Sequence, residues 1–176
     1  MIINPVAGLG GSVGLKGSDG MVEEALARGA VPQAERRAAA ALQELLELQD
    51  SLTIYTGAGA MGETLVKAMG FSCCVMESAA AEVTTAEDTR ALSCWLQEQG
   101  MDLILFTGGD GTARDICATA NDTAVFLGIP AGMKIHSPVY ARSPISAGRL
   151  AAPAGGHRRQ GAGSGTLRLS LCHLRL

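Results

Sequence analysis

The stretch D-L-I-L-F-T-G-G-D-G-T, residues 102–112, decides the fold of this chain. Residues 102–107 form a nearly continuous apolar run, which is typical of a central strand buried on both faces of a parallel sheet. Residues 108–112 (G-G-D-G-T) follow at once, and residues 112–120 then place apolar side chains at helical spacing. The stretch therefore predicts a strand, a glycine-rich turn and a short helix in immediate succession.

On both sides of this stretch, short apolar segments alternate with segments of helical periodicity. The strand-like segments are 1–3, 52–55, 71–76 and 125–129. The helical segments are 35–49, 59–69 and 84–100. Strands that alternate with helices form a parallel sheet that is covered on both faces. We therefore expect an α/β fold with a three-layer, Rossmann-like parallel sheet and helices on both faces.

A few residues predict where the helices begin and end. Gly70 stands where a left-handed C-cap is typical. Thr84 and Glu87 have the spacing of a capping box that opens the helix over residues 84–100. Ser137 followed by proline is typical of an N-cap with proline at the first helical position. We expect Pro144 to kink or restart that last helix.

The composition excludes several classes of protein. The chain has 176 residues, 47% of them hydrophobic, and a formal net charge of −3. The apolar fraction is too high for intrinsic disorder, and the mild acidity argues against a nucleic-acid-binding protein. No apolar run approaches the roughly 20 residues of a membrane span, and residues 1–10 lack the charged start of a signal peptide. We expect neither nucleic acid nor a membrane among the partners.

The five cysteines indicate a reducing compartment. Their number is odd, no C-x-x-C pair occurs, and the spacing of a structural zinc site is absent. We interpret them as buried small hydrophobic residues and expect a cytoplasmic protein.

The chain divides near residue 150. Residues 1–150 carry the alternating pattern and all the acidic side chains, and we expect them to form one nucleotide-binding α/β domain. Residues 151–176 hold four arginines, no acid and no sustained period, which predicts an irregular basic tail. Because its composition departs so sharply from the rest, we interpret this tail as a truncated or wrong-frame end.

Three loops follow predicted strands and should share one edge of the sheet. They are residues 4–11 (N-P-V-A-G-L-G-G), 108–112 and 129–137 (I-P-A-G-M-K-I-H-S). Ligands of open parallel sheets bind at the carboxyl ends of the strands, in the crevice where the strand order reverses. The chemistry of the protein is therefore expected where these three loops meet.

The G-G-D-G-T loop predicts a phosphate site. Glycine backbones approach phosphates closely, and their N–H groups, together with the start of the next helix, attract anions. Asp110 would repel a phosphate unless the site also holds Mg²⁺ or the carboxylate accepts a proton from an attacking hydroxyl. Thr112 either caps the helix or donates to a phosphate oxygen. The alternative is an ordinary turn in which Asp110 and Thr112 are turn and cap residues.

The first and third loops carry weaker signals. Asn4-Pro followed by glycines is turn chemistry by default, but its place after the first strand favours a ligand role. Lys134 has the charge to neutralise phosphate, with a solvated side chain as the alternative. His136 would hydrogen-bond either a ribose or phosphate group, or a backbone group. Lys16 and Asp19 lie near enough in sequence to reach a ligand or to be solvated.

Four motifs in order give the chain a resemblance to a known family. They are residues 2–11, 13–20 (V-G-L-K-G-S-D-G), 108–115 (G-G-D-G-T-A-R-D) and 127–137 (L-G-I-P-A-G-M-K-I-H-S). G-G-D-G-T after an apolar strand resembles the signature of the NAD kinase superfamily, which includes diacylglycerol and sphingosine kinases. The four together are similar to the bacterial and archaeal ATP-NAD kinase-like proteins, among them acetoin-catabolism protein X. The resemblance covers residues 1–150 and implies the N-terminal domain of an NAD kinase.

The resemblance implies a phosphotransferase. It would move a phosphoryl group from ATP, or polyphosphate, to the 2′-hydroxyl on the adenosine ribose of NAD and give NADP. Asp110 would be the catalytic carboxylate, which activates that hydroxyl or organises Mg²⁺. Phosphates would lie against Gly108, Gly109, Gly111 and Thr112.

The resemblance also implies a second phosphate loop and an assembly. Asn4 and the glycines after it, Gly8, Gly10 and Gly11, would form the loop that faces G-G-D-G-T. Lys134 would add a cation to the same edge. NAD kinases form homo-oligomers through a second, β-rich domain, so a homo-oligomer is implied.

Two other classes of function are alternatives. NAD kinases carry an Asn-Glu pair in their second domain, and this chain contains no Asn-Glu dipeptide. The chain would then be a non-catalytic nucleotide-binding or regulatory protein of the acetoin-catabolism protein X type, or an inactive truncated kinase domain. A lipid kinase ranks last, because residues 1–150 show neither an apolar nor a basic membrane-facing pattern.

Overall fold

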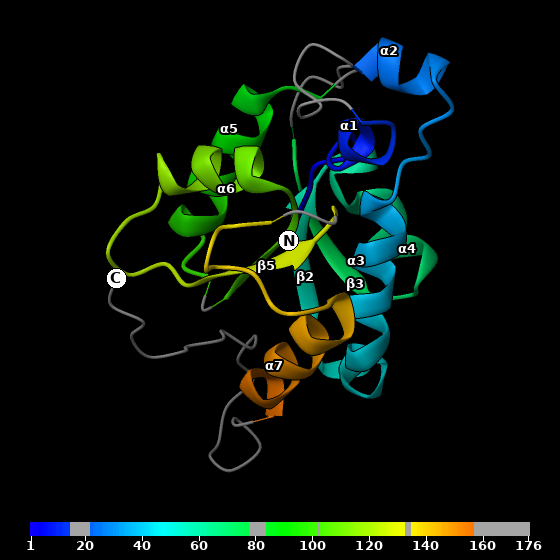
Figure 1. The fold of residues 1–176 in the computed structure, drawn as a ribbon. Helices are drawn as coiled ribbons and strands as arrows, with labels where there is room; N and C mark the ends of the chain where they lie inside the picture. The colour runs from blue at the N-terminus through cyan, green and yellow to red at the C-terminus, as the bar shows by residue number, and fades with distance from the viewer. Residues whose placement is uncertain (15–21, 78–83, 102, 133–134, 157–176) are drawn as a thin grey trace, which may run out of the picture.

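Five parallel strands form the centre of the molecule (Figure 1). The computed structural model describes residues 1–14, 22–77, 84–101, 103–132 and 135–156. The strands are β1 (Ile2–Ile3), β2 (Thr53–Gly57), β3 (Ser72–Met76), β4 (Ile104–Gly108) and β5 (Phe126–Pro130). They pair as a three-stranded sheet, in the order β1-β4-β5, and a two-stranded sheet of β2 and β3.

The two sheets meet along β1 and β2. The main-chain nitrogen of Met1 donates to the carbonyl oxygen of Tyr55 in β2, and β1 lies against β2. Across the molecule the strands therefore run β3, β2, β1, β4, β5. The chain leaves β1 toward one side and returns through β4 on the other, which is the reversal that creates a ligand crevice in doubly wound folds.

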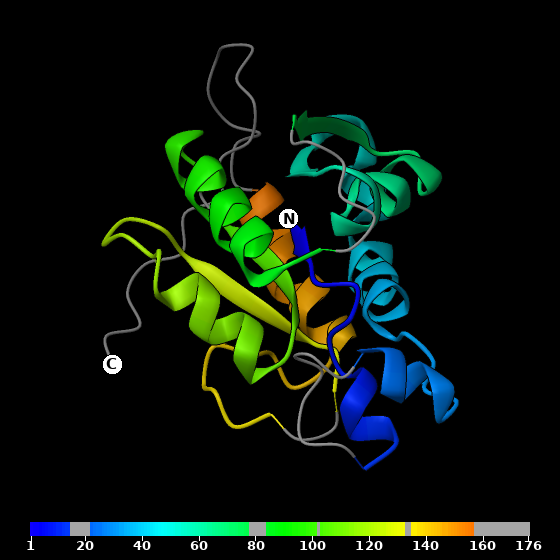
Figure 2. The ribbon, with the colours of Figure 1, turned by 90° about the horizontal axis from the view of Figure 1, so that it is seen from above.

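Helices cover both faces of the strands (Figure 2). The α-helices are α1 (Leu9–Ser12), α2 (Val22–Ala27), α3 (Ala34–Leu42), α4 (Glu63–Ala68), α5 (Ala86–Glu98), α6 (Asp110–Cys117) and α7 (Pro144–Gly156), and the 3-10 helices are η1 (Gln43–Ser51) and η2 (Gly59–Met61). Helices α3 and α7 contact β5 on one face, whereas α5 contacts β1 and α6 contacts β4 on the other. The three-layer α/β fold with parallel strands is confirmed.

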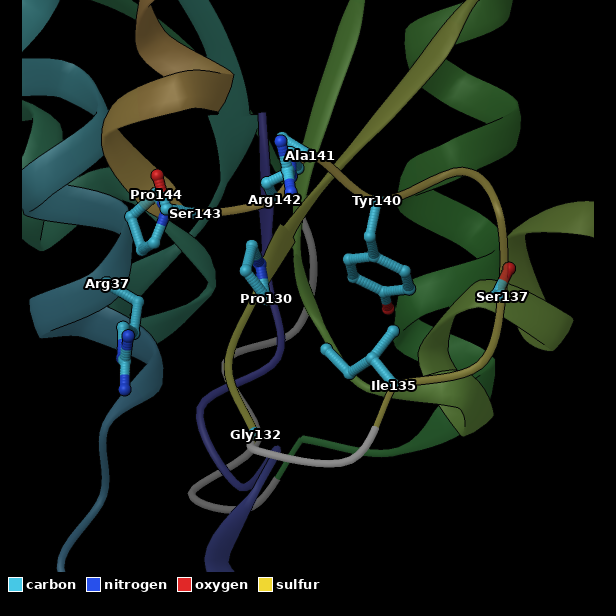
Figure 3. Close-up of a pocket in the computed structure, with 10 residues that line it drawn as sticks. All are labelled: Arg37, Pro130, Gly132, Ile135, Ser137, Tyr140, Ala141, Arg142, Ser143 and Pro144. Carbon is cyan, nitrogen blue, oxygen red and sulfur yellow. The ribbon is translucent and has the colours of Figure 1, made fainter.

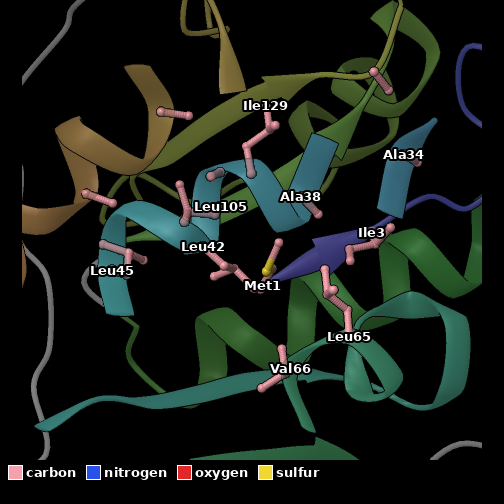
Figure 4. Close-up of a cluster of buried hydrophobic side chains, with 14 of the residues drawn as sticks. Met1, Ile3, Ala34, Ala38, Leu42, Leu45, Leu65, Val66, Leu105 and Ile129 are labelled. Atoms are coloured by element: carbon pink, nitrogen blue, oxygen red, sulfur yellow. The ribbon is translucent and has the colours of Figure 1, made fainter. Parts of the chain in front are cut away.

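The core on the α3 and α7 side is built from alternate residues of the strands, whose side chains point to this face (Figure 4). Ile3, Leu105 and Ile129 pack there against Ala38 and Leu42 of α3. Small residues let the two helices of this layer approach closely. A Cβ on Gly148 of α7 would lie 2.2 Å from the carbonyl oxygen of Ala41.

The opposite core uses the neighbouring strand residues, because successive side chains of a strand point to opposite faces. Ile2, Ile104 and Phe106 pack against Leu92 of α5 and Ile116 of α6. All five side chains are at most 1% exposed. The two-sided burial of β4 confirms that residues 102–107 contain a central strand, although the strand itself begins at Ile104.

Two predicted helices are interrupted. The helix predicted over 35–49 ends at Leu42, and the chain continues as the 3-10 helix η1. The helix predicted over 59–69 breaks at Gly62, whose φ is 144° and whose Cβ would lie 2.0 Å from the Thr56 hydroxyl. Gly70, with φ 80°, ends α4 in the expected left-handed conformation.

The capping box of α5 lies one residue later than predicted. Thr85, not Thr84, has the extended backbone of an N-cap, and its hydroxyl accepts from the Asp88 N–H at 3.3 Å. The Asp88 carboxylate accepts from the Thr85 N–H at 2.7 Å, so Asp88 takes the role predicted for Glu87.

The helix start predicted at Ser137-Pro138 is wrong. Residues 135–143 form an extended loop, which pairs with β5 through the Gly128 N–H to Val139 oxygen bond of 2.8 Å. The equivalent signal is used at the next Ser-Pro pair. Helix α7 begins at Pro144, and the Ser143 hydroxyl accepts from the Ser146 N–H at 3.1 Å.

The four cysteines among the described residues are free but less buried than predicted. Cys73 and Cys74 are half-buried, whereas Cys94 and Cys117 are exposed on the helix surfaces.

The predicted tail lies outside the described residues, apart from the part of α7 up to Gly156. No helix among the described residues has the length and apolarity needed to cross a membrane.

Candidate functional site

The three predicted loops meet at the carboxyl edge of β1, β4 and β5. The Asn4 N–H donates to the Thr107 oxygen, and the Ala131 N–H donates to the Gly108 oxygen, both at 3.0 Å. Gly8 brings the first loop against the third. It adopts φ 81°, and a Cβ there would lie 2.7 Å from the Ala131 oxygen. The edge is therefore one continuous surface made by loops far apart in sequence.

Gly108 ends β4 and Gly109 follows it, and the structure constrains these two positions differently. A Cβ on Gly108 would lie 2.4 Å from the Thr112 Cβ, so the packing of the fold requires glycine there. A Cβ on Gly109 would meet no atom of the described residues within 4 Å, and its φ of −121° suits any residue. The described part of the fold therefore does not require glycine at position 109, and no described residue fills the space beside it.

Helix α6 begins at Asp110, two residues earlier than predicted, with Gly109 as its N-cap. The first-turn N–H groups of a helix have no partner within it and attract anions. The open space at Gly109 lies directly before this turn. The start of α6 therefore offers N–H groups that have no partner within the helix, beside Gly109, and the phosphate-binding role of residues 108–112 stays a prediction.

The Asp110 carboxylate is oriented by the third loop. Its Oδ1 accepts from the backbone N–H groups of His136 and Ser137, at 3.2 and 3.1 Å, and its Oδ2 shares the His136 N–H at 3.1 Å. The residue is half-buried. A carboxylate has about four lone-pair sites, so Oδ2 keeps capacity for a further proton or cation.

Tyr140 is a residue of this site that the sequence analysis missed. Its hydroxyl donates to the Gly109 oxygen at 2.6 Å, its ring packs edge-on to Phe106 with centroids 5.2 Å apart, and it fills the space that a side chain on Gly128 would need. Burial, and secondly the charge of Asp110, raise the pKa of Tyr140 well above its usual range. The neutral hydroxyl therefore holds the peptide that leads into Asp110.

Asn4 and Thr112 link the first two loops. The Asn4 side-chain nitrogen donates to the Thr112 hydroxyl at 3.0 Å, and the Asn4 side-chain oxygen accepts from the Val6 N–H at 3.2 Å. Thr112 is 3% exposed and lies in the third position of α6, so the predicted capping role is wrong. Both side chains hold the loops together rather than point outward.

Some of the remaining predicted site residues are described by the structure, and others are not. Gly10 and Gly11 lie in the short helix α1, directly after Gly8. Among the outer residues, His136 is exposed and meets Asp110 through its backbone N–H. Lys134, Lys16 and Asp19 lie outside the described residues.

Comparison with known families agrees with the geometry. Residues 4–152 match the family model described as the ATP-NAD kinase N-terminal domain. The match includes all three loops and Asp110, and it confirms the resemblance that the four motifs indicate. A search among proteins of curated function finds no match to the chain.

Proposed function

The chain belongs to the ATP-NAD kinase family, and on this premise we propose that it transfers a phosphoryl group from ATP or polyphosphate to the 2′-hydroxyl on the adenosine ribose of NAD. The product is NADP. Asp110 is the catalytic carboxylate, and the loops at residues 4–11 and 108–112 hold the phosphates.

One observation supports this proposal most. The Asp110 carboxylate accepts three N–H contacts from His136 and Ser137, at 3.1–3.2 Å, at the point where the strand order reverses. It is therefore held in one direction before any ligand binds. Phosphoryl transfer depends mainly on such positioning and on charge neutralisation.

The chemistry assigned to Asp110 is the removal of one proton. The ribose hydroxyl oxygen attacks the terminal phosphorus of the donor, a new O–P bond forms, and the bond from that phosphorus to the leaving phosphate oxygen breaks. The hydroxyl proton goes to Oδ2 of Asp110, which has a lone pair left for it. With ATP as the donor, the leaving group is ADP.

Mg²⁺ is the cofactor that the family implies, and the residues present fit a site in which one carboxylate and the substrate phosphates bind the ion. No group of three or more His, Cys, Asp or Glu side chains gathers among the described residues. Mg²⁺ is commonly bound by one or two carboxylates together with substrate phosphates, so Oδ2 of Asp110 would hold it as the alternative to taking the proton, and the donor phosphates would supply further ligands. When bound, Mg²⁺ neutralises charge on the phosphates.

NADP formation from NAD and Mg·ATP by the purified chain tests the proposal. We expect turnover by the wild type and its loss in Asp110→Asn. Asparagine keeps an oxygen that accepts the His136 and Ser137 N–H groups, so the loop geometry stays while the base is removed. Absence of turnover in the wild type contradicts the proposal.

Asp115→Asn is the matched control. Asp115 lies on the same helix and pairs with Arg90 of α5 at 2.6 Å, and Asp115→Asn removes the same charge as Asp110→Asn. We expect it to keep its activity. If both variants lose activity equally, charge on α6 rather than the chemistry of Asp110 is responsible.

A further inference from the structure

An open cavity of about 470 Å³ lies beside the three-loop site, at the carboxyl end of β5 (Figure 3). Its walls come from separate parts of the chain. Helix α3 contributes Arg37, the end of β5 contributes Pro130, and the loop before α7 contributes Ser137, Tyr140 and Arg142. The size is within the range of small-molecule sites.

The charged side chains in the described lining of this cavity, Arg37 and Arg142, are both positive. Arg37 is half-buried and Arg142 is exposed, and no acidic side chain belongs to the described lining. Neither arginine forms an ion pair within the described residues, whereas Arg28, Arg90 and Arg149 each pair with a carboxylate. Two arginines therefore line one cavity, and neither has an ion-pair partner among the described residues.

The start of α7 adds to this potential. Ser143 and Pro144 both line the cavity, and the 13-residue helix begins at Pro144. The N-terminal end of a helix carries a partial positive charge. Guanidinium groups bind phosphate oxygens in pairs, with a fork geometry that lysine lacks. The cavity thus combines a fixed dipole with two groups suited to phosphate.

We infer that this cavity binds an oligophosphate, the triphosphate of a nucleotide or an inorganic polyphosphate chain. The cavity adjoins Asp110, because Ser137 lines it and donates its N–H to that carboxylate at 3.1 Å. The bound phosphates are those of the phosphoryl donor, an identification that rests on the proposed function. Binding itself does not rest on turnover.

Calorimetric titration of the full chain with sodium tripolyphosphate, at physiological ionic strength, tests the inference. We expect saturable binding that Arg37→Gln and Arg142→Gln each weaken by about tenfold or more, the loss of a charge-assisted hydrogen bond. ATP should lose affinity by the same factor, and adenosine should not bind. Thermal unfolding of each variant shows whether the fold is kept.

Arg36→Gln is the matched control. Arg36 neighbours Arg37 on α3, is exposed and does not belong to the lining. We expect its tripolyphosphate affinity to stay within about twofold of wild type. The inference is overturned if tripolyphosphate does not bind, or if Arg36→Gln weakens binding as much as Arg37→Gln, because diffuse charge would then explain it.

Asp110→Asn separates this inference from the proposed function. It removes the proposed base but none of the cations around the cavity, so tripolyphosphate should bind it at least as tightly as wild type. Binding that depends on Arg37, without NADP formation by the wild type, would support the cavity and contradict the kinase proposal. NADP formation by the wild type without such binding would support the kinase proposal and contradict the cavity inference.

Discussion

The side-chain amide of Asn4 donates to the hydroxyl of Thr112 at 3.0 Å, across 108 positions of sequence. Asn4 follows the first strand and Thr112 lies in the helix after the fourth. This bond, with the Asn4 N–H to Thr107 oxygen bond of 3.0 Å, fixes the first loop against the G-G-D-G-T loop. The two proposed phosphate loops therefore depend on each other for their positions.

Replacing Asn4 tests this dependence. Asn4→Ala leaves the Val6 N–H and the buried Thr112 hydroxyl without their partner, so we expect the free energy of unfolding to fall by about 1–3 kcal/mol. Asn4→Asp keeps the acceptor for the Val6 N–H and replaces the amide donor with an oxygen to which the Thr112 hydroxyl donates, so it should be less destabilised. Urea unfolding of both variants measures this. Equal losses in the two would show that the side-chain contacts contribute little.

The two glycines at the end of β4 should separate stability from activity. Gly108→Ala forces a Cβ against Thr112, so we expect a loss of about 1–3 kcal/mol in the free energy of unfolding. Gly109→Ala meets open space and should keep stability within about 0.5 kcal/mol. If a ligand occupies that space, Gly109→Ala lowers NADP formation by about tenfold or more. Full activity in folded Gly109→Ala would contradict a ligand at this position.

Gly8 and Gly14 form a matched pair for the contact between the first and third loops. Both have positive φ, 81° and 78°, but among the described residues only Gly8 has a close neighbour, the Ala131 oxygen. Alanine at either position should cost about 1–2 kcal/mol for the left-handed backbone. Gly8→Ala should cost about 1–3 kcal/mol more because of the steric clash. Chemical denaturation of the two variants gives the difference, and similar values would argue against the tight contact.

Tyr140→Phe removes the bond to the Gly109 oxygen but keeps the ring on Phe106. We expect the free energy of unfolding to fall by about 1 kcal/mol near neutral pH. We also expect weaker phosphoryl transfer, because the peptide before Asp110 loses its restraint. Activity and urea unfolding of this one variant check both effects. An unchanged variant would mean that the hydroxyl does not position the loop.

The free energy of unfolding should depend on pH differently in wild type and in Tyr140→Phe. Burial and the charge of Asp110 raise the pKa of Tyr140 above its ordinary value of 10.0, so the folded chain holds this proton more tightly than the unfolded chain. The resulting stability is complete below pH 10 and is lost as the pH rises toward the folded pKa. Unfolding free energies from pH 8 to 11 should therefore fall more steeply for wild type than for Tyr140→Phe. Parallel curves would contradict the shift.

Local sequence signals located elements better than their ends. The spacing of a capping box is present at both Thr84 and Thr85, and the structure shows the box at Thr85 with Asp88. Ser-Pro occurs twice, and the helix begins at Ser143-Pro144 because the earlier segment is held by Asp110 and Tyr140. Neither choice is visible without the neighbouring loops.

The sequence by itself determined the α/β class, the apolar central strand, and the three loops that carry glycines and Asp110. These follow from periodicity, from two-sided burial and from the backbone freedom of glycine, which are local properties. Only the tertiary structure decided what those loops contact: Asn4 on Thr112, Gly8 on Ala131, and Asp110 on the backbone of residues 136–137. Tyr140 and the Arg37 cavity also arise only there, because long-range pairing of distant loops leaves no periodic signal in the chain.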